Sequence, residues 1–221
     1  MSKPDRRELP AYSPAEAAHY LTIPVSTIRY WAAGRSGVSQ AIIQPAQKQP
    51  LILSFSNLVE LHVLGAIRRQ FEISMPKARA SVALLRKRFS VERPLVAEQF
   101  ETDGIDLFVQ KYGQLLNVTQ DGQAVMRHIL EASLKRIERD DHGIPIRLFP
   151  YTRNSIDNAP RLIVIDPELG FGRPVIAGTG LVTEEIAARY KAGDSIPELA
   201  RDYGRPTEEI EEAVRCELQA A

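Results

Sequence analysis

The residues that decide the fold are Tyr12-Ser-Pro-Ala-Glu-Ala-Ala-His-Tyr-Leu-Thr-Ile-Pro-Val-Ser-Thr-Ile-Arg-Tyr-Trp31, which Gly34 follows. They predict two short helices joined by a tight turn. Ser13 and Glu16 stand three residues apart, so the hydroxyl and the carboxylate can each accept a backbone N–H where the first helix begins. This is the layout of a helix-turn-helix, although a plain two-helix hairpin in a larger fold has the same pattern.

The second of these helices is expected to begin at Ser26 or Thr27. Ile28, Trp31 and Ala32 recur at positions i, i+3 and i+4, which predicts its buried face. The side chains expected to face outward are those of Ser26, Thr27, Arg29 and Tyr30. Hydroxyl groups, a guanidinium and a phenol on such a helix can contact phosphates and base edges in the major groove of DNA. These four residues are therefore predicted DNA contacts.

A β-hairpin is predicted after the second helix. Its strands are residues 41–43 and 51–55, and a loose tip containing Gln and Pro joins them. A hairpin in this position is the wing of a winged helix-turn-helix. Lys48 at its tip is expected to lie beside the DNA backbone, and Arg35 is a further predicted phosphate contact.

Charge is unevenly distributed along the chain, although the formal net charge is zero. Residues 1–88 contain thirteen Lys and Arg against five Asp and Glu, a net charge of +8. Residues 89–160 carry −3, and residues 161–221 carry −5. A basic first third favours contact with nucleic acid, whereas an acidic remainder is repelled by phosphates. Chance segregation on a solvated surface is the alternative explanation.

Length and composition are those of an ordinary globular protein. The chain has 221 residues, of which 44% are hydrophobic and 25% are charged. The longest apolar tract, residues 51–67, contains Glu60 and His62, so no membrane span is expected. The first residues lack the apolar core of a signal peptide, which predicts a cytoplasmic protein. The single cysteine, Cys216, excludes a disulfide within the chain.

The central segment is expected to combine strands and one helix. Residues 105–109 and 115–118 are predicted to pair as a β-hairpin, and a helix is predicted over residues 123–139. The apolar stripe of that helix consists of Met126, Leu130, Leu134 and Ile137. A further strand is predicted over residues 144–149. Residues 151–160, rich in Asn, Asp, Ser and Pro, are the best candidate for a linker.

The last sixty or so residues predict a compact trihelical unit. A strand at 162–165 leads into a glycine-rich run at 170–180, in which tight turns surround a short strand. Three helices then follow, and the last is expected to bury Ile210, Val214 and Leu218. Its outer face is expected to expose a cluster formed by Glu208, Glu209, Glu211 and Glu212. Because phosphates repel such a surface, this unit is predicted to bind protein.

The predicted fold class is mainly α with small β elements (α+β), divided into three domains. Residues 1–90 form a winged helix-turn-helix DNA-binding domain, and residues 91–158 form a central β-hairpin and helix with the linker. Residues 159–221 form a trihelical, homeodomain-like bundle.

No pattern in the sequence supports catalysis or a bound cofactor. The glycine-rich run lacks the lysine of a phosphate-binding P-loop, and Pro174 removes a backbone amide that such a loop uses. The four histidines have no metal-ligand spacing. We therefore expect a protein that is not an enzyme and holds no metal.

Two parts of the chain resemble known families. The stretch Tyr12–Trp31 is similar to the DNA-reading half of MerR and excisionase-like winged helix-turn-helix domains. Ile163-Val-Ile-Asp-Pro167 and Gly172-Arg-Pro-Val-Ile-Ala-Gly-Thr-Gly180, followed by Ala192-Gly-Asp-Ser-Ile-Pro-Glu-Leu-Ala-Arg-Asp-Tyr203, resemble a small bacterial domain of unknown function. Members of that family are commonly encoded beside PIN-like ribonuclease toxins and treated as VapB-like antitoxins. With Phe100–Val109 included, the resemblance to a longer antitoxin spans almost the whole chain. The chain departs from it at Gly180-Leu181, where many short members are expected to have Arg-Ile.

This resemblance implies a DNA-binding antitoxin of a type II toxin–antitoxin system. Such a protein represses its own operon and neutralises a PIN-like ribonuclease toxin by binding it, and an acidic segment can cover the basic RNA-binding surface of that nuclease. One recognition helix covers a half-site of the operator DNA, which predicts a homodimer. The predicted partner contacts are Arg173, Pro174, Thr179, Glu208 and Glu212. The alternatives are a MerR-like regulator whose central segment binds a small ligand and an enzyme acting on DNA.

Overall fold

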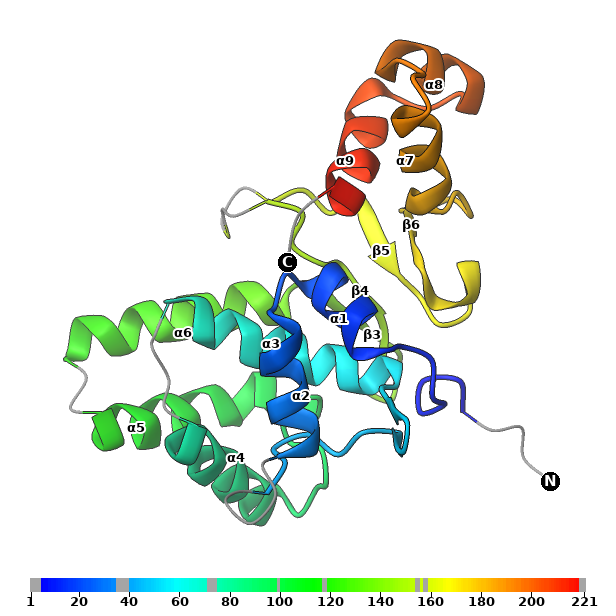
Figure 1. Cartoon of the computed structure of the whole chain (residues 1–221). Helices are drawn as coiled ribbons and strands as arrows, with labels where there is room; N and C mark the ends of the chain where they lie inside the picture. The colour runs from blue at the N-terminus through cyan, green and yellow to red at the C-terminus, as the bar shows by residue number, and fades with distance from the viewer. Residues whose placement is uncertain are drawn as a thin grey trace.

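The computed structural model describes residues 5–34, 40–70, 75–98, 100–116, 119–153, 156 and 159–218. Over these residues the chain is mainly helical and contains a two-stranded and a four-stranded antiparallel sheet (Figure 1). The prediction of a mainly α fold with small β elements is therefore confirmed.

The two predicted N-terminal helices are α1 (Pro14–Leu21) and α2 (Val25–Ala33). The capping box of α1 is confirmed, because the Glu16 N–H donates to Ser13 Oγ at 3.2 Å and the Ser13 N–H donates to Glu16 Oε2 at 2.8 Å. Gly34 ends α2, as expected, and its N–H donates to the Tyr30 carbonyl. The second helix begins at Val25, one residue earlier than predicted.

The hairpin after α2 is smaller than predicted. Its strands are β1 (Gln47–Lys48) and β2 (Leu51–Ile52), which pair antiparallel. The prediction of a strand at 41–43 is wrong. Ile42 and Ile43 are buried instead, and their N–H groups donate to the Trp31 carbonyl at 2.9 and 3.1 Å. This segment therefore packs against the end of α2 rather than pairing with β2.

Four further helices pack beside the α1–α2 pair. They are α3 (Phe55–Gln70), α4 (Met75–Phe89), α5 (Ile105–Leu116) and α6 (Gln120–Leu134). In Figure 1, α4, α5 and α6 lie to the left of the α1–α2 pair. Helix α3 packs on α6, and α5 packs on both α4 and α6.

The predicted β-hairpin is wrong over residues 105–116, because α5 occupies them after a short π-helix, η1 (Phe100–Gly104). Residues 117 and 118 of the second predicted strand lie outside the described residues. Ile105, Phe108 and Val109 are buried at helical spacing. The Phe108 ring packs edge-on against Phe100, with the ring centroids 6.0 Å apart. A short apolar run fits either a strand or a helix face, and here packing against neighbouring helices decides for the helix.

Helix α6 ends earlier than predicted. Met126, Leu130 and Leu134 form its buried stripe, as expected, but Ile137 lies in strand β3 (Ile137–Arg139). Ile137 pairs with Leu148 in β4 (Pro145–Leu148). The pairing with β4 supplies backbone hydrogen bonds to residues 137–139, in place of those that a longer α6 would have supplied.

The larger sheet has the strand order β3-β4-β5-β6, with β5 at Ile163–Ile165 and β6 at Pro174–Ile176. The predicted strands at 144–149 and 162–165 and the short strand within the glycine-rich run are confirmed. This sheet joins strands from both sides of the predicted linker. One hydrophobic cluster likewise contains side chains from α1 through β4 and Ile165 of β5.

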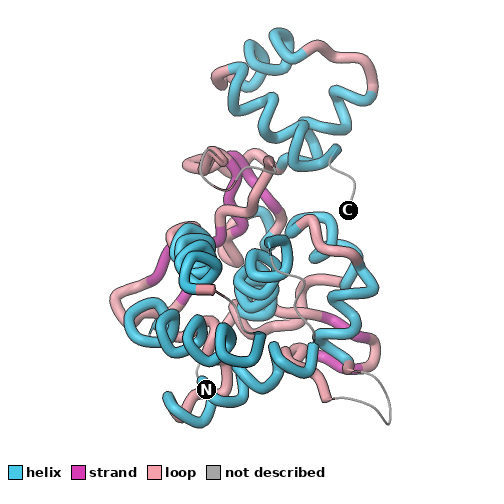
Figure 2. The backbone as a smooth tube through the Cα atoms, turned by 90° about the vertical axis from the view of Figure 1, so that its left-hand side faces the viewer, coloured by secondary structure: helices cyan, strands magenta, loops and turns pink. Residues whose placement is uncertain are grey.

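Three helices follow β6: α7 (Thr183–Lys191), α8 (Ile196–Tyr203) and α9 (Thr207–Leu218). Helix α7 packs on β6, α9 packs on both β5 and β6, and α8 packs on α7 and α9. Figure 2 shows these three helices at one end of the molecule, connected to the rest through the strands. Ile210 and Val214 are buried as predicted, but Leu218 is 45% exposed. No helix in the described ranges is sufficiently long and apolar to cross a bilayer.

Candidate nucleic-acid interface

The outward face of α2 carries Ser26 and Arg29, both exposed as predicted. Thr27 is buried, which corrects the expectation that it faces outward. Its hydroxyl accepts a hydrogen bond from Nη1 of Arg68 on α3. Thr27 lies on the side of α2 that faces Arg68. Its hydroxyl therefore helps to hold the Arg68 guanidinium beside α2.

Two arginines from other helices lie against the aromatic residues of α2. The Arg68 guanidinium lies 5.9 Å from the centroid of Trp31, and that of Arg79 on α4 lies 5.1 Å from the centroid of Tyr30. Arg79 Nε also donates to the Gln40 carbonyl at 2.6 Å. Tyr30 is thus half-buried and contacts a cation. The structure thus brings positive charge from α3 and α4 beside α2, and the sequence offered no local signal for this.

The β1–β2 hairpin lies next to the C-terminal end of α2. Ala32 and Ala33 line a concave region of about 560 Å³ together with Lys48 and Gln49. Lys48 is exposed there. The structure therefore brings Lys48 near the C-terminal end of α2. Arg35, the remaining predicted DNA contact, lies outside the described residues.

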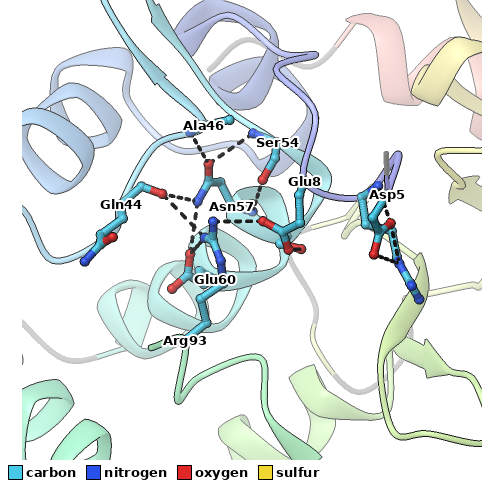
Figure 3. A network of polar contacts seen from close by, with 10 residues as sticks. Asp5, Glu8, Gln44, Ala46, Ser54, Asn57, Glu60 and Arg93 are labelled. Carbon is cyan, nitrogen blue, oxygen red and sulfur yellow. Dashed lines mark hydrogen bonds and ion pairs between the residues drawn. The ribbon is translucent and has the colours of Figure 1, made fainter. Parts of the chain in front are cut away.

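A buried polar network fixes the base of this hairpin (Figure 3). Asn57 Oδ1 accepts the N–H groups of Ala46 at 3.1 Å and Ser54 at 3.0 Å. Its Nδ2 donates to the Gln44 carbonyl at 2.8 Å and to Glu60 Oε2 at 3.1 Å. One side chain of α3 thus bonds both arms that lead into the hairpin.

Arg93 connects this network to the N-terminal segment. Its Nη1 donates to Glu60 Oε2 at 2.7 Å, and its Nη2 donates to Glu8 Oε2 at 3.0 Å. Glu60 is buried, and this burial raises its pKa to about 7, although the Arg93 charge acts in the opposite direction. Sequence reasoning missed this network. An Asn and a Glu three residues apart, with apolar residues of α3 between them, were the available signal.

Glu60→Gln is expected to remove a pH-dependent loss of stability. Between the ordinary pKa of 4.5 and the folded value of about 7, the folded chain holds a proton that the unfolded chain releases. The contribution of Glu60 to the free energy of unfolding therefore falls by up to about 3 kcal/mol as the pH rises through this window. Urea unfolding at about pH 5 and about pH 7.5 measures it. An equal pH effect in wild type and variant contradicts the assignment.

The predicted partner residues in the glycine-rich run have mostly structural contacts. Pro174 is buried in β6. Thr179 Oγ1 donates to the Ile176 carbonyl at 2.8 Å and accepts the Leu181 N–H at 3.1 Å, which closes the turn after β6. Arg173 is partly exposed and pairs with Glu184 at 3.2 Å.

The predicted glutamate cluster on α9 is only partly exposed. Glu208 is exposed, but Glu212 is fully buried, which corrects its assignment to the surface. Arg153 Nη2 donates to Glu212 Oε2 at 2.6 Å, and Arg215 lies 3.5 Å from the same oxygen. Glu212 therefore holds the segment after β4 against α9. In the described ranges, no three His, Cys, Asp or Glu side chains are grouped as metal ligands.

The C-terminal unit covers part of α1 and leaves the outward face of α2 open. Tyr12 Oη donates to the Gly172 carbonyl at 2.9 Å, and His19 Nε2 lies 3.1 Å from Glu217 Oε2. Contacts between α1 and α9 accompany these bonds. The α1 region and the C-terminal unit are therefore in direct contact, whereas Ser26 and Arg29 on α2 remain exposed.

Comparisons with known proteins match most of the chain. Residues 163–215 match a family model described as "Protein of unknown function (DUF433)". The chain is 28% identical to a Mycobacterium tuberculosis protein named "Putative antitoxin VapB45", over 95% of this chain and 94% of that protein. It is 25% identical to "Uncharacterized protein Rv2308" of the same organism, over 94% of this chain and 89% of that protein.

A solved structure has the same fold. The crystal structure of Rv2018 from Mycobacterium tuberculosis superposes with a TM-score of 0.72 at 24% sequence identity. The match covers 95% of this chain and 99% of that chain. The chain is thus a distant homologue of a protein with an antitoxin name, and its overall fold, over 95% of its length, occurs in a crystal structure.

Proposed function

We propose that this protein is a DNA-binding antitoxin of a type II toxin–antitoxin system, which represses its own operon and neutralises a PIN-like ribonuclease. The observation that carries the proposal is the similarity to VapB45 over 95% of the chain. In this proposal the protein is not an enzyme, and its two activities are binding of operator DNA and binding of the toxin.

In the proposed DNA complex, α2 enters the major groove. Arg29 contacts base edges and Ser26 contacts base edges or phosphates, since both are exposed on the outward face. Arg68, Arg79 and Lys48 contact phosphates on either side of the helix. Thr27 and Tyr30 act through Arg68 and Arg79, which they bond and stack upon. Arg35 is kept as a proposed phosphate contact.

In the proposed toxin complex, the acidic remainder of the chain contacts the basic RNA-binding surface of the nuclease. Residues 161–221 carry a net charge of −5, and Glu208 exposes its carboxylate on α9. Opposite charges on two surfaces accelerate their encounter and discriminate against wrong partners. Residues 1–90 would then be the DNA-binding domain and residues 159–221 the protein-binding domain.

A homodimer is proposed because two recognition helices must reach half-sites about 34 Å apart. Met126, Leu130 and Leu134 are buried within the core of the chain itself, so they do not supply the dimer seam. Light scattering at micromolar concentration is expected to give twice the chain mass. A monomer mass both with and without operator DNA contradicts the dimer.

A gel-shift titration tests the DNA half of this function. Its probes are the DNA upstream of the protein's own reading frame and a scrambled fragment of equal length. The full chain is expected to retain the upstream fragment at a salt concentration that releases the scrambled one, because only non-specific binding rests entirely on phosphate contacts. Equal affinity for both fragments at every salt concentration contradicts repression of its own operon.

A further inference from the structure

The turn between β5 and β6 places an aromatic side chain almost entirely in solvent. Phe171 is 94% exposed, the largest fraction among the large hydrophobic residues that the structure describes. Its backbone is left-handed, with φ 58° and ψ 31°, a conformation that bulky residues rarely adopt. An exposed apolar ring and a strained backbone are both unfavourable for folding, and such strain occurs preferentially at functional sites.

The neighbouring glycines impose this conformation. Gly170 and Gly172 have φ values of 56° and 78°. A Cβ on Gly170 would lie 2.9 Å from Val175 Cγ1, and a Cβ on Gly172 would collide with the Tyr12 hydroxyl. The same hydroxyl donates to the Gly172 carbonyl in a buried position. The turn is therefore clamped at both sides of Phe171, with the ring directed away from the protein.

Backbone hydrogen bonds hold the rest of the turn. The Gly172 N–H donates to the Leu169 carbonyl at 2.8 Å, and the Leu169 N–H donates to the Asp166 carbonyl at 3.0 Å. Asp166 Oδ1 also accepts the Glu168 N–H at 2.8 Å. A ring on such an ordered turn loses little conformational freedom on binding, which is a property of aromatic anchors in protein interfaces.

An apolar groove begins two residues before the ring. Leu169 is 37% exposed and lines a groove of about 510 Å³. The other apolar residues of this groove are Phe149, Val164 and Ala177, and charged side chains of Glu138, Arg147 and Arg161 also line it. An apolar centre beside charged groups is the usual composition of a protein interface.

We propose that Phe171, together with Leu169 and this groove, is the anchor through which the chain binds its ribonuclease toxin. This inference rests on the proposed function. The partner surface would be a basic one that contains an apolar pocket for the ring. Glu168 lies in the turn and Glu184 lies on α7, with side chains that are 65% and 66% exposed, and each is paired with an arginine, Arg6 at 3.1 Å and Arg173 at 3.2 Å. The acidic unit around them repels DNA, and the chain's own basic surface lies at α2.

Phe171→Gly in the full-length chain tests this anchor. Affinity for the ribonuclease encoded by the neighbouring reading frame is measured by calorimetry and is expected to fall by roughly 30-fold or more, as for a central aromatic anchor. The midpoint of thermal unfolding is expected to stay the same or rise, because glycine adopts the left-handed conformation without strain. Phe171→Asn, which also tolerates this conformation, is expected to behave alike.

The matched control is Leu218→Ala, which removes another exposed apolar side chain of the same unit and is expected to leave toxin affinity unchanged. Toxin binding by wild type that persists in Phe171→Gly overturns the anchor and leaves the proposed function standing. Absence of toxin binding by wild type overturns the function itself. If the thermal unfolding midpoint of Phe171→Gly falls by many degrees, the Phe171 ring stabilises the fold rather than binding a partner. If Phe171→Gly no longer self-associates but still binds the toxin, the ring contacts a second copy of this chain instead. Either outcome overturns the anchor.

Discussion

Replacing Arg136 by alanine is expected to lower the free energy of unfolding by roughly 3–5 kcal/mol. Arg136 is buried in the turn between α6 and β3. Its guanidinium donates to the carbonyls of Phe149 at 2.6 Å, Pro150 at 2.9 Å, Ala159 at 3.0 Å and Pro160 at 2.9 Å. These carbonyls lie at the two ends of the segment that connects β4 to β5. In Arg136→Ala these four carbonyls lose their shared donor, so the connection to the C-terminal unit is expected to loosen.

Arg136→Lys is expected to recover only a small part of this loss, because an ammonium has no planar fork of donors to reach carbonyls at both ends of this segment. Arg161→Ala is the matched control. That arginine stacks on Phe149 at 4.1 Å, but its side chain is 45% exposed, so a loss of about 1 kcal/mol or less is expected. Urea unfolding followed by circular dichroism measures all three variants. A cost below about 1 kcal/mol for Arg136→Ala contradicts the clamp.

Replacing Arg29 by alanine is expected to weaken operator binding by roughly 1–3 kcal/mol, about 5- to 150-fold. The reason is that Arg29 is exposed on the outward face of α2, where a guanidinium can bond two acceptors on a guanine edge. The effect should be smaller on unrelated DNA. A gel-shift titration on both fragments measures the difference.

Lys48→Ala provides the comparison for a phosphate contact. It is expected to weaken all DNA sequences alike and to reduce the salt slope by about one, because one fewer phosphate is neutralised. Unchanged operator affinity in an Arg29→Ala, Tyr30→Ala double variant contradicts the placement of α2 in the major groove.

The elements predicted correctly from the sequence are those with local signals. The capping box at Ser13, the stop at Gly34 and the apolar spacing in α2 each involve residues within about four positions of one another. Such contacts form in any tertiary context, so a single sequence predicts them. The strands β4, β5 and β6 were likewise marked by short apolar runs between turn residues.

The errors arise where distant residues decide the structure. Ile137 leaves the helical pattern because Leu148 pairs with it, and residues 105–116 are helical because α4 and α6 pack against them. Glu212 has the spacing of a surface residue, yet Arg153, 59 positions away, pairs with it in the interior. A polar segment at 151–160 predicted a plain linker, whereas Arg136 bonds the carbonyls at its end.

The candidate interface was predictable in part. Ser26 and Arg29 follow from the helical period of α2. Arg68 and Arg79 do not, because their places beside Trp31 and Tyr30 depend on how α3 and α4 pack. The exposure of Phe171 was also beyond the sequence, since it depends on bonds between the turn and Tyr12.

The most direct test of the central proposal is a ribonuclease assay of the protein encoded beside this chain. The purified nuclease is given a labelled RNA and titrated with the full-length chain. The antitoxin proposal predicts that cleavage falls steadily and stops near one chain per nuclease, and that Phe171→Gly requires a much higher concentration. Cleavage that continues undiminished at a large excess of the wild-type chain contradicts the proposal.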